Sequence, residues 1–158
     1  NLTLGQEEEL KMYSIGEISK MFDLPISTLR YYDKEGLFPH LKRVNGVRQF
    51  SENEIETLRI IDCLKRSGLK IKDIKEYMNL CSLGNSTLKQ RKEIFVKQKE
   101  EVLQEMEKLQ KVLSMLNYKC WYYDQAIEKE DEGYVRALSF EQLPPQIQQY
   151  YQHSHEDC

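Results

Sequence analysis

Residues 14–36 read SIGEISKMFDLPISTLRYYDKEG and predict two short helices joined by a tight turn. The stretch opens on a capping box, in which the Ser14 hydroxyl accepts from the Glu17 amide while the Glu17 side chain reaches back to the helix start. Apolar residues then follow at helical spacing, and they are Ile15, Ile18, Met21 and Phe22. This pattern predicts a short first helix that ends near Asp23.

A second short helix is predicted directly after the first. Asp23 is of the residue type that caps helices, and Pro25 is tolerated in a first helical turn. The second helix then runs to Gly36, which is a natural stop. Because so tight a turn joins two short helices, the stretch is predicted to be a helix-turn-helix.

The segment 37–50 has a different character. It contains a proline that blocks a helix, and Asn45-Gly46 lies between two valines, which is a strong signal for a β-hairpin. We therefore expect two short strands that form a basic wing carrying Arg43 and Arg48.

Two further helices complete the predicted domain. Ser51 and Glu54 form a second capping box, and the helix that follows them ends near residue 68. Apolar residues at helical spacing mark a short fourth helix over residues 71–78. The fold class expected for the chain is therefore mainly α, with a winged helix-turn-helix DNA-binding domain.

From about residue 87 the sequence reads as one long helix to at least Asn117, because no glycine or proline interrupts it. One side of this helix carries apolar residues in a heptad pattern, and they are Leu88, Phe95, Val102, Met106, Leu109, Leu113 and Leu116. So long a helix with one apolar stripe needs a partner helix. A second helix of the same chain is one candidate, but the tail is too short and polar for this role. We therefore expect a homodimer.

The predicted organisation has four parts. Residues 1–11, which include three consecutive glutamates, are expected to be a leader or a cloning remnant. Residues 12–82 form the winged helix-turn-helix domain, and residues 83–120 form a linker and the dimerisation helix. Residues 121–158 are expected to form a short helix at about 121–129, followed by a loosely ordered tail.

Composition narrows the function classes. The net charge of −3 argues against a general polyanion binder, so any nucleic-acid surface must be local. Apolar runs are too short to span a bilayer, no secretory signal is expected, and the four cysteines form no CxxC pair. These features favour a cytoplasmic protein with reduced thiols. No Ser/His/Asp set and no phosphate-binding glycine loop is found, so we expect neither an enzyme nor a cofactor.

The residue types in the helix-turn-helix and the wing suit duplex DNA. A helix fits the major groove, and a basic hairpin beside it can hold the backbone. Ser14 can present a hydroxyl and an amide to a phosphate at a helix N-terminus. Of Tyr31 and Tyr32, one is expected to be a core aromatic. The candidate DNA-binding residues are Ser14, Thr28, Arg30, Tyr31, Arg43, Asn45, Gly46 and Arg48.

Four segments together resemble the MerR family of bacterial transcriptional regulators. They are YSIGEISK at 13–20, TLRYYDKEGL at 28–37, RVNGVRQF at 43–50 and SGLKIKDI at 67–74. The resemblance covers about residues 12–120 and implies a homodimer joined by an antiparallel coiled coil. It also implies that the operator is double-stranded DNA and lies between two promoter elements that are set too far apart for efficient transcription. The regulator would then activate transcription by RNA polymerase by bending and untwisting that DNA.

The resemblance leaves the effector open. Metal sensors of the family resemble one another in carrying two thiols just after the dimerisation helix, whereas Cys120 here has no second cysteine close behind it. A terminal cluster of His153, His155 and Cys158 is conceivable, but a frayed polar tail is the better interpretation. We therefore expect no metal site.

Residues 61–65 resemble the segment in which the thiol-dependent, electrophile-responsive branch of the family carries its reactive cysteine. On a helix, Arg59 and Arg66 can share the face of Cys63, and nearby cations favour the reactive thiolate. Cys63 is therefore the candidate sensor thiol, with a buried structural cysteine as the alternative. A metal or small ligand sensed at the C-terminal end of the coiled coil is a second alternative. A coiled-coil interaction protein without a DNA role is a third, although it would have no use for a basic wing.

Overall fold

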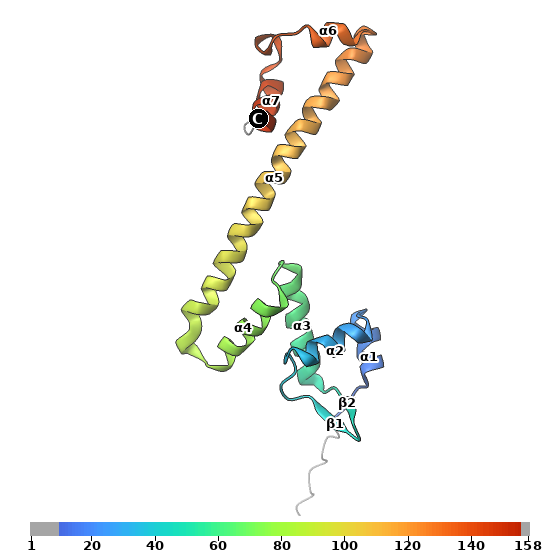
Figure 1. The fold of residues 1–158 in the computed structure, drawn as a ribbon, viewed down its shortest axis with the longest axis vertical. Coiled ribbons are helices and arrows are strands. Elements are labelled where there is room, and N and C mark those ends of the chain that lie inside the picture. Colours follow the sequence, from blue (N-terminus) through green and yellow to red (C-terminus); the bar gives the residue numbers. More distant parts are fainter. Residues whose placement is uncertain (1–9, 156–158) are drawn as a thin grey trace, which may run out of the picture. The chain divides into compact units, whose positions relative to one another are not determined.

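The computed structural model describes residues 10–155 (Figure 1). The described residues divide into two compact units, with the boundary between Gln98 and Lys99. Most of the expected leader lies outside the described residues. The elements are α1 (Ile15–Phe22), α2 (Ile26–Lys34), β1 (Lys42–Val44), β2 (Val47–Gln49), α3 (Glu52–Arg66), α4 (Ile71–Ser82), η1 (Asn85–Thr87), α5 (Leu88–Lys129), α6 (Glu132–Arg136), η2 (Phe140–Gln142) and α7 (Pro145–His155). The predicted class, mainly α with a helix-turn-helix and a long helix, is confirmed.

Both predicted capping boxes are present. The Ser14 hydroxyl accepts from the Glu17 amide at 3.1 Å, and the Ser14 amide donates to Glu17 Oε2 at 2.8 Å. Ser51 and Glu54 form the second box at the start of α3. These hydrogen bonds satisfy backbone groups that the start of a helix leaves unpaired, so they fix where α1 and α3 begin.

Asp23 has a different role from the predicted one. It does not cap α2, because Pro25 occupies that position. Asp23 instead ends α1 in the left-handed conformation, with a φ of 51°, and its amide donates to the Ser19 carbonyl. Aspartate is one of the few residue types that tolerate this conformation. The turn between the two helices is therefore set by the end of α1.

The predicted wing is a two-stranded antiparallel hairpin of β1 and β2. Asn45 and Gly46 both have positive φ, of 52° and 76°, as a tight two-residue hairpin turn requires. The register places Arg43 directly opposite Arg48. The two arginine side chains of the wing therefore lie close together on the same face of the hairpin.

The core of the first unit is built mainly by α1, α2, α3 and α4. Phe50, at the end of the wing, is fully buried, and its ring meets that of Phe38 edge to face at 5.6 Å. Its backbone pairs with Tyr13, just before α1, so the wing is anchored to the core. The largest fully buried side chains are Tyr32, Phe50, Ile18, Leu29, Leu37, Ile55, Leu58, Ile61 and Ile74.

α5 is one continuous helix from Leu88 to Lys129, so the separate short helix expected at 121–129 is wrong. No glycine or proline occurs in this stretch to interrupt it. In the first unit, the Phe95 ring packs edge to face on Tyr77 of α4 at 5.1 Å. Among the described residues, no helix combines the length and apolar character needed to cross a membrane.

The segment after α5 is ordered, which corrects the expectation of a loose tail. In the second unit, α6 leads to α7, which returns alongside α5 (Figure 1). The Tyr151 ring lies 5.3 Å from that of Tyr118, and the ring nitrogens of His153 lie 2.8 Å from Ser114 Oγ and 3.0 Å from Glu107 Oε1. The tail covers part of α5 because spaced apolar residues within it are buried, namely Val135, Leu143 and Ile147.

Candidate nucleic-acid interface

α2 turns one side to the core and the other to solvent. Tyr32 is only 2% exposed, whereas Tyr31 is 47% exposed, so one tyrosine of the pair is a core aromatic, as expected. The Tyr32 hydroxyl accepts from Lys65 Nζ at 2.9 Å, which ties α2 to α3. Arg30 is exposed and Thr28 is half-buried. The outer side of α2 therefore offers a hydroxyl, a guanidinium and a phenol.

Ser14 is exposed, but both of the groups predicted to hold a phosphate already contact Glu17. The Ser14 amide is committed to the Glu17 carboxylate, and only the hydroxyl proton is left to donate. A carboxylate beside the site also repels a phosphate. Ser14 is therefore a poorer phosphate site than its position in the sequence indicates.

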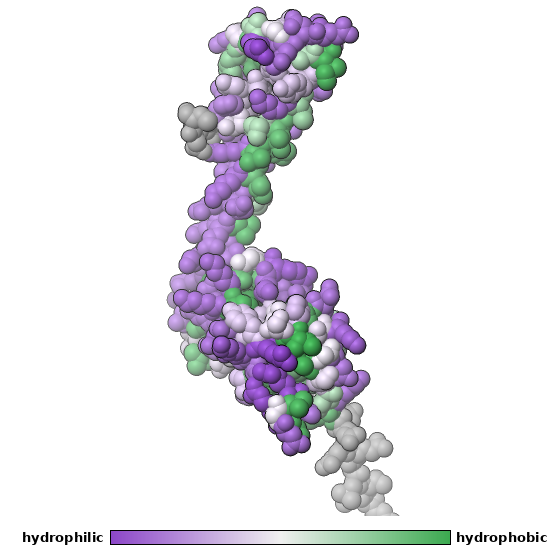
Figure 2. All heavy atoms as spheres, turned by 45° about the vertical axis from the view of Figure 1, so that its right-hand side comes forward, coloured by the Kyte–Doolittle hydropathy of each residue, from purple (hydrophilic) through white to green (hydrophobic). Residues whose placement is uncertain are grey.

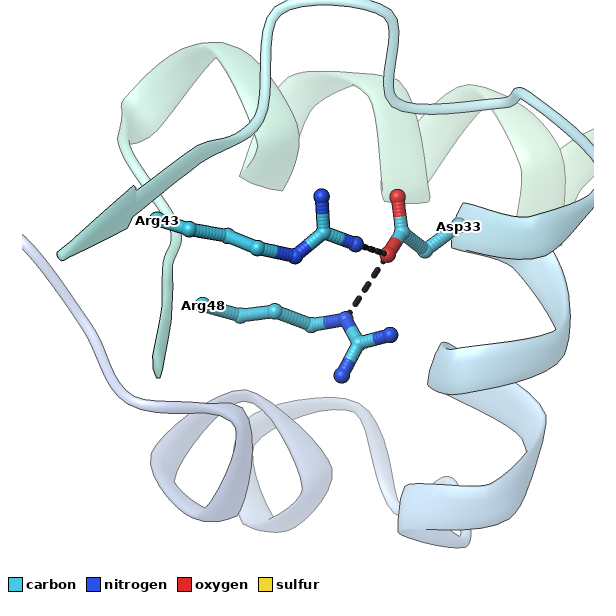
Figure 3. Close-up of polar contacts among 3 residues, drawn as sticks. All are labelled: Asp33, Arg43 and Arg48. Carbon is cyan, nitrogen blue, oxygen red and sulfur yellow. Dashed lines mark hydrogen bonds and ion pairs between the residues drawn. The ribbon is translucent and has the colours of Figure 1, made fainter. Parts of the chain in front are cut away.

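The two wing arginines meet on one carboxylate oxygen of α2 (Figure 3). Asp33 Oδ2 accepts from Arg43 Nη2 at 2.5 Å and from Arg48 Nε at 2.7 Å. The Asp33 side chain is only 11% exposed, against 48% for Arg43 and 26% for Arg48. This contact joins the wing to the helix-turn-helix. Asp33 is a residue that the sequence alone did not single out.

Each wing guanidinium keeps donors that Asp33 does not use. A guanidinium carries five N–H donors in a planar fork, and Arg48 engages Asp33 through Nε alone, so both of its Nη groups are left over. Arg43 engages Asp33 through Nη2. In Figure 3 the Nη groups of Arg48 point away from the carboxylate. The wing can therefore hold its arginines in place and still donate to an anion.

A long apolar stripe on α5 is left uncovered. Leu109 is 60% exposed, and the predicted seam residues beside it are exposed to similar degrees. Figure 2 shows apolar side chains gathered along one side of this helix, next to a strongly polar side. The exposed seam residues are Leu88, Phe95, Val102, Met106, Leu109, Leu113 and Leu116, and the same stripe continues to Tyr123 and Ile127.

α7 does not cover this stripe. A helix turns about 100° per residue, so Glu107, Ser114 and Tyr118, which contact α7, lie roughly 140° around α5 from the seam. A helix of the same chain, α7, does pack on α5, but on a different side from the seam. Apart from Phe95, which packs on Tyr77, the heptad seam has no partner among the described residues. So extensive an exposed apolar stripe is typical of an interaction surface.

Two family models match the chain. The model of the MerR HTH family regulatory protein matches residues 13–81, and the model of the MerR DNA-binding region matches residues 55–118. An HTH-type transcriptional regulator of Haemophilus influenzae is 32% identical over 133 residues, which make up 84% of this chain and 96% of the relative. The chain belongs to the MerR family. It is a DNA-binding transcriptional regulator and not an enzyme.

Solved structures of MerR family members have the same fold. HiNmlR, a MerR family regulator lacking the sensor domain and bound to promoter DNA, has a TM-score of 0.58 at 30% identity, covering 81% of this chain and 100% of that chain. A MerR regulator from Bacillus thuringiensis has a TM-score of 0.53 at 39% identity, covering 70% of this chain and 97% of its own. The family models end at residue 118, so α6 and α7 lie beyond them.

The surroundings of Cys63 in this MerR protein differ from those that the sequence predicts. Cys63 is exposed on α3, so it is not a buried core thiol. Arg59 is paired with Glu56, and Arg66 is paired with Asp62 at 3.1 Å. Both guanidinium groups are thus compensated by carboxylates, and neither has a recorded contact with the thiol in the described residues.

A cation does contact a different thiol. Arg91 Nη1 donates to the Cys81 sulfur at 3.8 Å, and Arg91 Nη2 donates to the Gly84 carbonyl at 2.9 Å. A hydrogen bond with Cys81 and burial both raise the pKa of Tyr77 above its ordinary value. The arginine lies ten residues from Cys81, on the next helix, and no helical spacing rule points to such a contact.

No group of three or more metal-ligating side chains is found among residues 10–155. His153 is held by Ser114 and Glu107, and Cys158 of the considered terminal cluster lies outside the described residues. Cys120, the other thiol considered for a metal site, is exposed on α5.

Proposed function

We propose that this MerR protein binds promoter DNA as a homodimer and that each protomer places one winged helix-turn-helix on one half of an inverted repeat. The proposal is carried by two features of the same chain. The heptad seam on α5 is exposed, and the wing arginines keep donors that Asp33 does not use. The promoter-bound state of the related HiNmlR supports it. Dimers of helix-turn-helix proteins match the symmetry of their sites.

In the proposed complex the exposed side of α2 enters the major groove. Thr28, Arg30 and Tyr31 are the side chains on this helix that can reach base edges or phosphates. Arg43 and Arg48 then lie beside the backbone, with Asn45-Gly46 at the tip of the wing. Phosphate contacts fix the orientation of the protein, and the helix in the groove supplies the sequence preference.

The exposed stripe of α5 supports dimerisation through this helix. The antiparallel coiled coil of the family would cover Val102, Leu109 and Leu116 with the equivalent stripe of a second copy. Because α7 lies on another side of α5, the tail does not obstruct this pairing. RNA polymerase is the further partner that the family implies, through the distortion of promoter DNA.

Arg43→Ala and Arg48→Ala are each expected to weaken DNA binding by about 1.5 kcal/mol, the value of one hydrogen bond to a charged group. The loss should be similar for all duplex sequences, because phosphates carry no sequence information. Each variant should also lower the slope of log affinity against log salt by about one. Fluorescence anisotropy titrations at several salt concentrations measure both quantities.

Arg136→Ala is the matched control for the wing variants. It removes the same charge, but from an exposed ion pair with Glu132 in the second unit. It should leave both affinity and salt slope unchanged. Wing variants with the salt slope of the unaltered protein would remove the wing from the interface.

For the effector we propose modification of Cys63 by aldehydes or other electrophiles. The exposed thiol can add across a carbonyl group, forming a sulfur–carbon bond while the proton passes to the carbonyl oxygen. The adduct forms on the exposed side of α3, a helix that packs against both α2 and α4. It would act by shifting these packed helices between discrete arrangements. Altered DNA twist would then change transcription while the operator stays bound.

Cys63→Ser is expected to keep the fold and DNA binding but to lose the response to formaldehyde or methylglyoxal. Cys81→Ser and Cys120→Ser should respond almost normally, because they leave the proposed thiol in place. Transcription from the cognate promoter, with and without the aldehyde, measures the response for all three variants. A loss confined to Cys120→Ser would instead favour sensing at the C-terminal end of the coiled coil, and a loss confined to Cys81→Ser would favour the Arg91-contacted thiol.

A further inference from the structure

We propose that Asp33 is a positioning residue for the contact between the wing and the DNA backbone. This inference rests on the proposed function and adds to it an acidic residue that strengthens binding to a polyanion. The supporting geometry is the single oxygen of Asp33 that receives Nη2 of Arg43 and Nε of Arg48 (Figure 3).

The register of the wing creates the need for such a residue. Arg43 and Arg48 are directly opposed across the hairpin, and like charges in opposed positions repel each other. A two-stranded hairpin is only marginally stable by itself. The Asp33 carboxylate lies between the two guanidinium groups and compensates their repulsion. Without this carboxylate the two arginines would separate and would lose a common orientation.

The place of Asp33 in α2 argues against a role in the helix itself. It lies in the last turn, where the helix dipole disfavours a negative charge. Its side chain is also 11% exposed, and a carboxylate withdrawn from water needs charged partners. Asp33 is therefore unfavourable for α2 alone, and the wing arginines are the groups that make it favourable.

Two physical effects predict opposite results for the removal of this charge. Simple electrostatics predicts tighter DNA binding, because one negative charge near the phosphates is lost. Preorganisation predicts weaker binding, because two long side chains would have to be ordered when the DNA arrives. The geometry favours preorganisation, since Asp33 uses only one donor atom of each arginine and leaves the others free.

The test is Asp33→Asn, which removes the charge and keeps the shape of the side chain. The probes are a duplex enriched by the protein from a random-sequence pool and a mixed-sequence duplex. We expect Asp33→Asn to bind both about tenfold more weakly, the loss of about one charge-assisted hydrogen bond. We also expect a salt slope lower by about one, because fewer phosphates are contacted. A variant that is only less stable would keep the salt slope of its folded fraction.

Glu35→Gln is the matched control. It removes the same charge at the same end of α2, and no ion pair is recorded for Glu35 in the described part of the chain. It should bind DNA as tightly as the unaltered protein or slightly more tightly. Asp33→Glu retains a carboxylate and should recover most of the salt slope, which keeps the test informative if Asp33→Asn proves poorly folded.

The double variant Arg43→Ala/Arg48→Ala supplies the second arm. In this background Asp33→Asn should cause no further loss of affinity, because the side chains that it positions are gone. If Asp33→Asn binds as tightly as the unaltered protein while both arginine variants bind weakly, the positioning role is refuted and the proposed interface stands. If the arginine variants also bind normally, the inference and the wing interface are both refuted.

Discussion

Replacing Leu109 and Leu113 together with Asp is expected to convert the protein to a monomer. Both side chains lie exposed on the heptad seam of α5, and in a coiled coil they would be buried against a second copy. Each buried leucine contributes about 1.5–3 kcal/mol, and an isologous interface loses it once in each protomer. The aspartates would also bury unpaired charge. Sedimentation equilibrium measures the change.

Met115→Asp is the control for this change. Met115 is an exposed apolar residue of the same helix, but it lies outside the seam. The Met115→Asp protein should stay dimeric. A seam variant that still sediments as a dimer would show that another surface joins the protomers, and the seam would then need a different explanation.

Phe50→Ala is expected to destabilise the first unit by about 3–5 kcal/mol, the usual cost of truncating a buried phenylalanine. The Phe50 ring is fully buried against Phe38, and its backbone pairs with Tyr13, so the cavity would open where the wing joins the core. Urea unfolding followed by circular dichroism gives the free energy of unfolding. The wing should lose its orientation as well, and DNA affinity should fall with it.

Val47→Ala is the matched control on the same hairpin. Val47 is exposed, so its truncation should change the free energy of unfolding by no more than about 0.5 kcal/mol. If Phe50→Ala proved as mild as Val47→Ala, Phe50 would not anchor the wing to the core.

Local signals in the sequence predict most of the first unit. The capping boxes at Ser14 and Ser51 act through hydrogen bonds within three residues, and Asn45-Gly46 acts through its own dihedral angles. Such signals need no knowledge of the rest of the chain. Asp23 is the exception, because aspartate suits both the start of a helix and a left-handed helix end, and only the structure distinguishes the two.

The ion pairs around Cys63 could have been anticipated from the sequence. Glu56 stands three residues before Arg59, and Asp62 stands four residues before Arg66, which are the spacings at which opposite charges pair on a helix. The interpretation of both arginines as partners of the thiol overlooks these closer competitors. The thiol hypothesis now rests on exposure and on the resemblance to the family.

Contacts between distant segments could not be predicted in this way. Asp33 lies ten and fifteen residues from its two arginine partners, and the pairing exists only because the wing folds back on α2. The return of α7 to α5 joins His153 to Ser114 across 39 residues. Neither contact produces a periodic pattern in the sequence. From the sequence alone, the tail is therefore predicted to be loosely ordered, and Asp33 does not differ from other acidic surface residues.

Selection from a random duplex pool can show whether a dimer of this protein recognises a specific promoter sequence. The purified protein is incubated with the pool, bound duplexes are recovered and sequenced through several rounds, and the mass of the final complex is measured. We expect one enriched inverted repeat, bound by two copies of the chain. Recovered duplexes that match the starting pool, or a specific complex that contains a single copy, would contradict it.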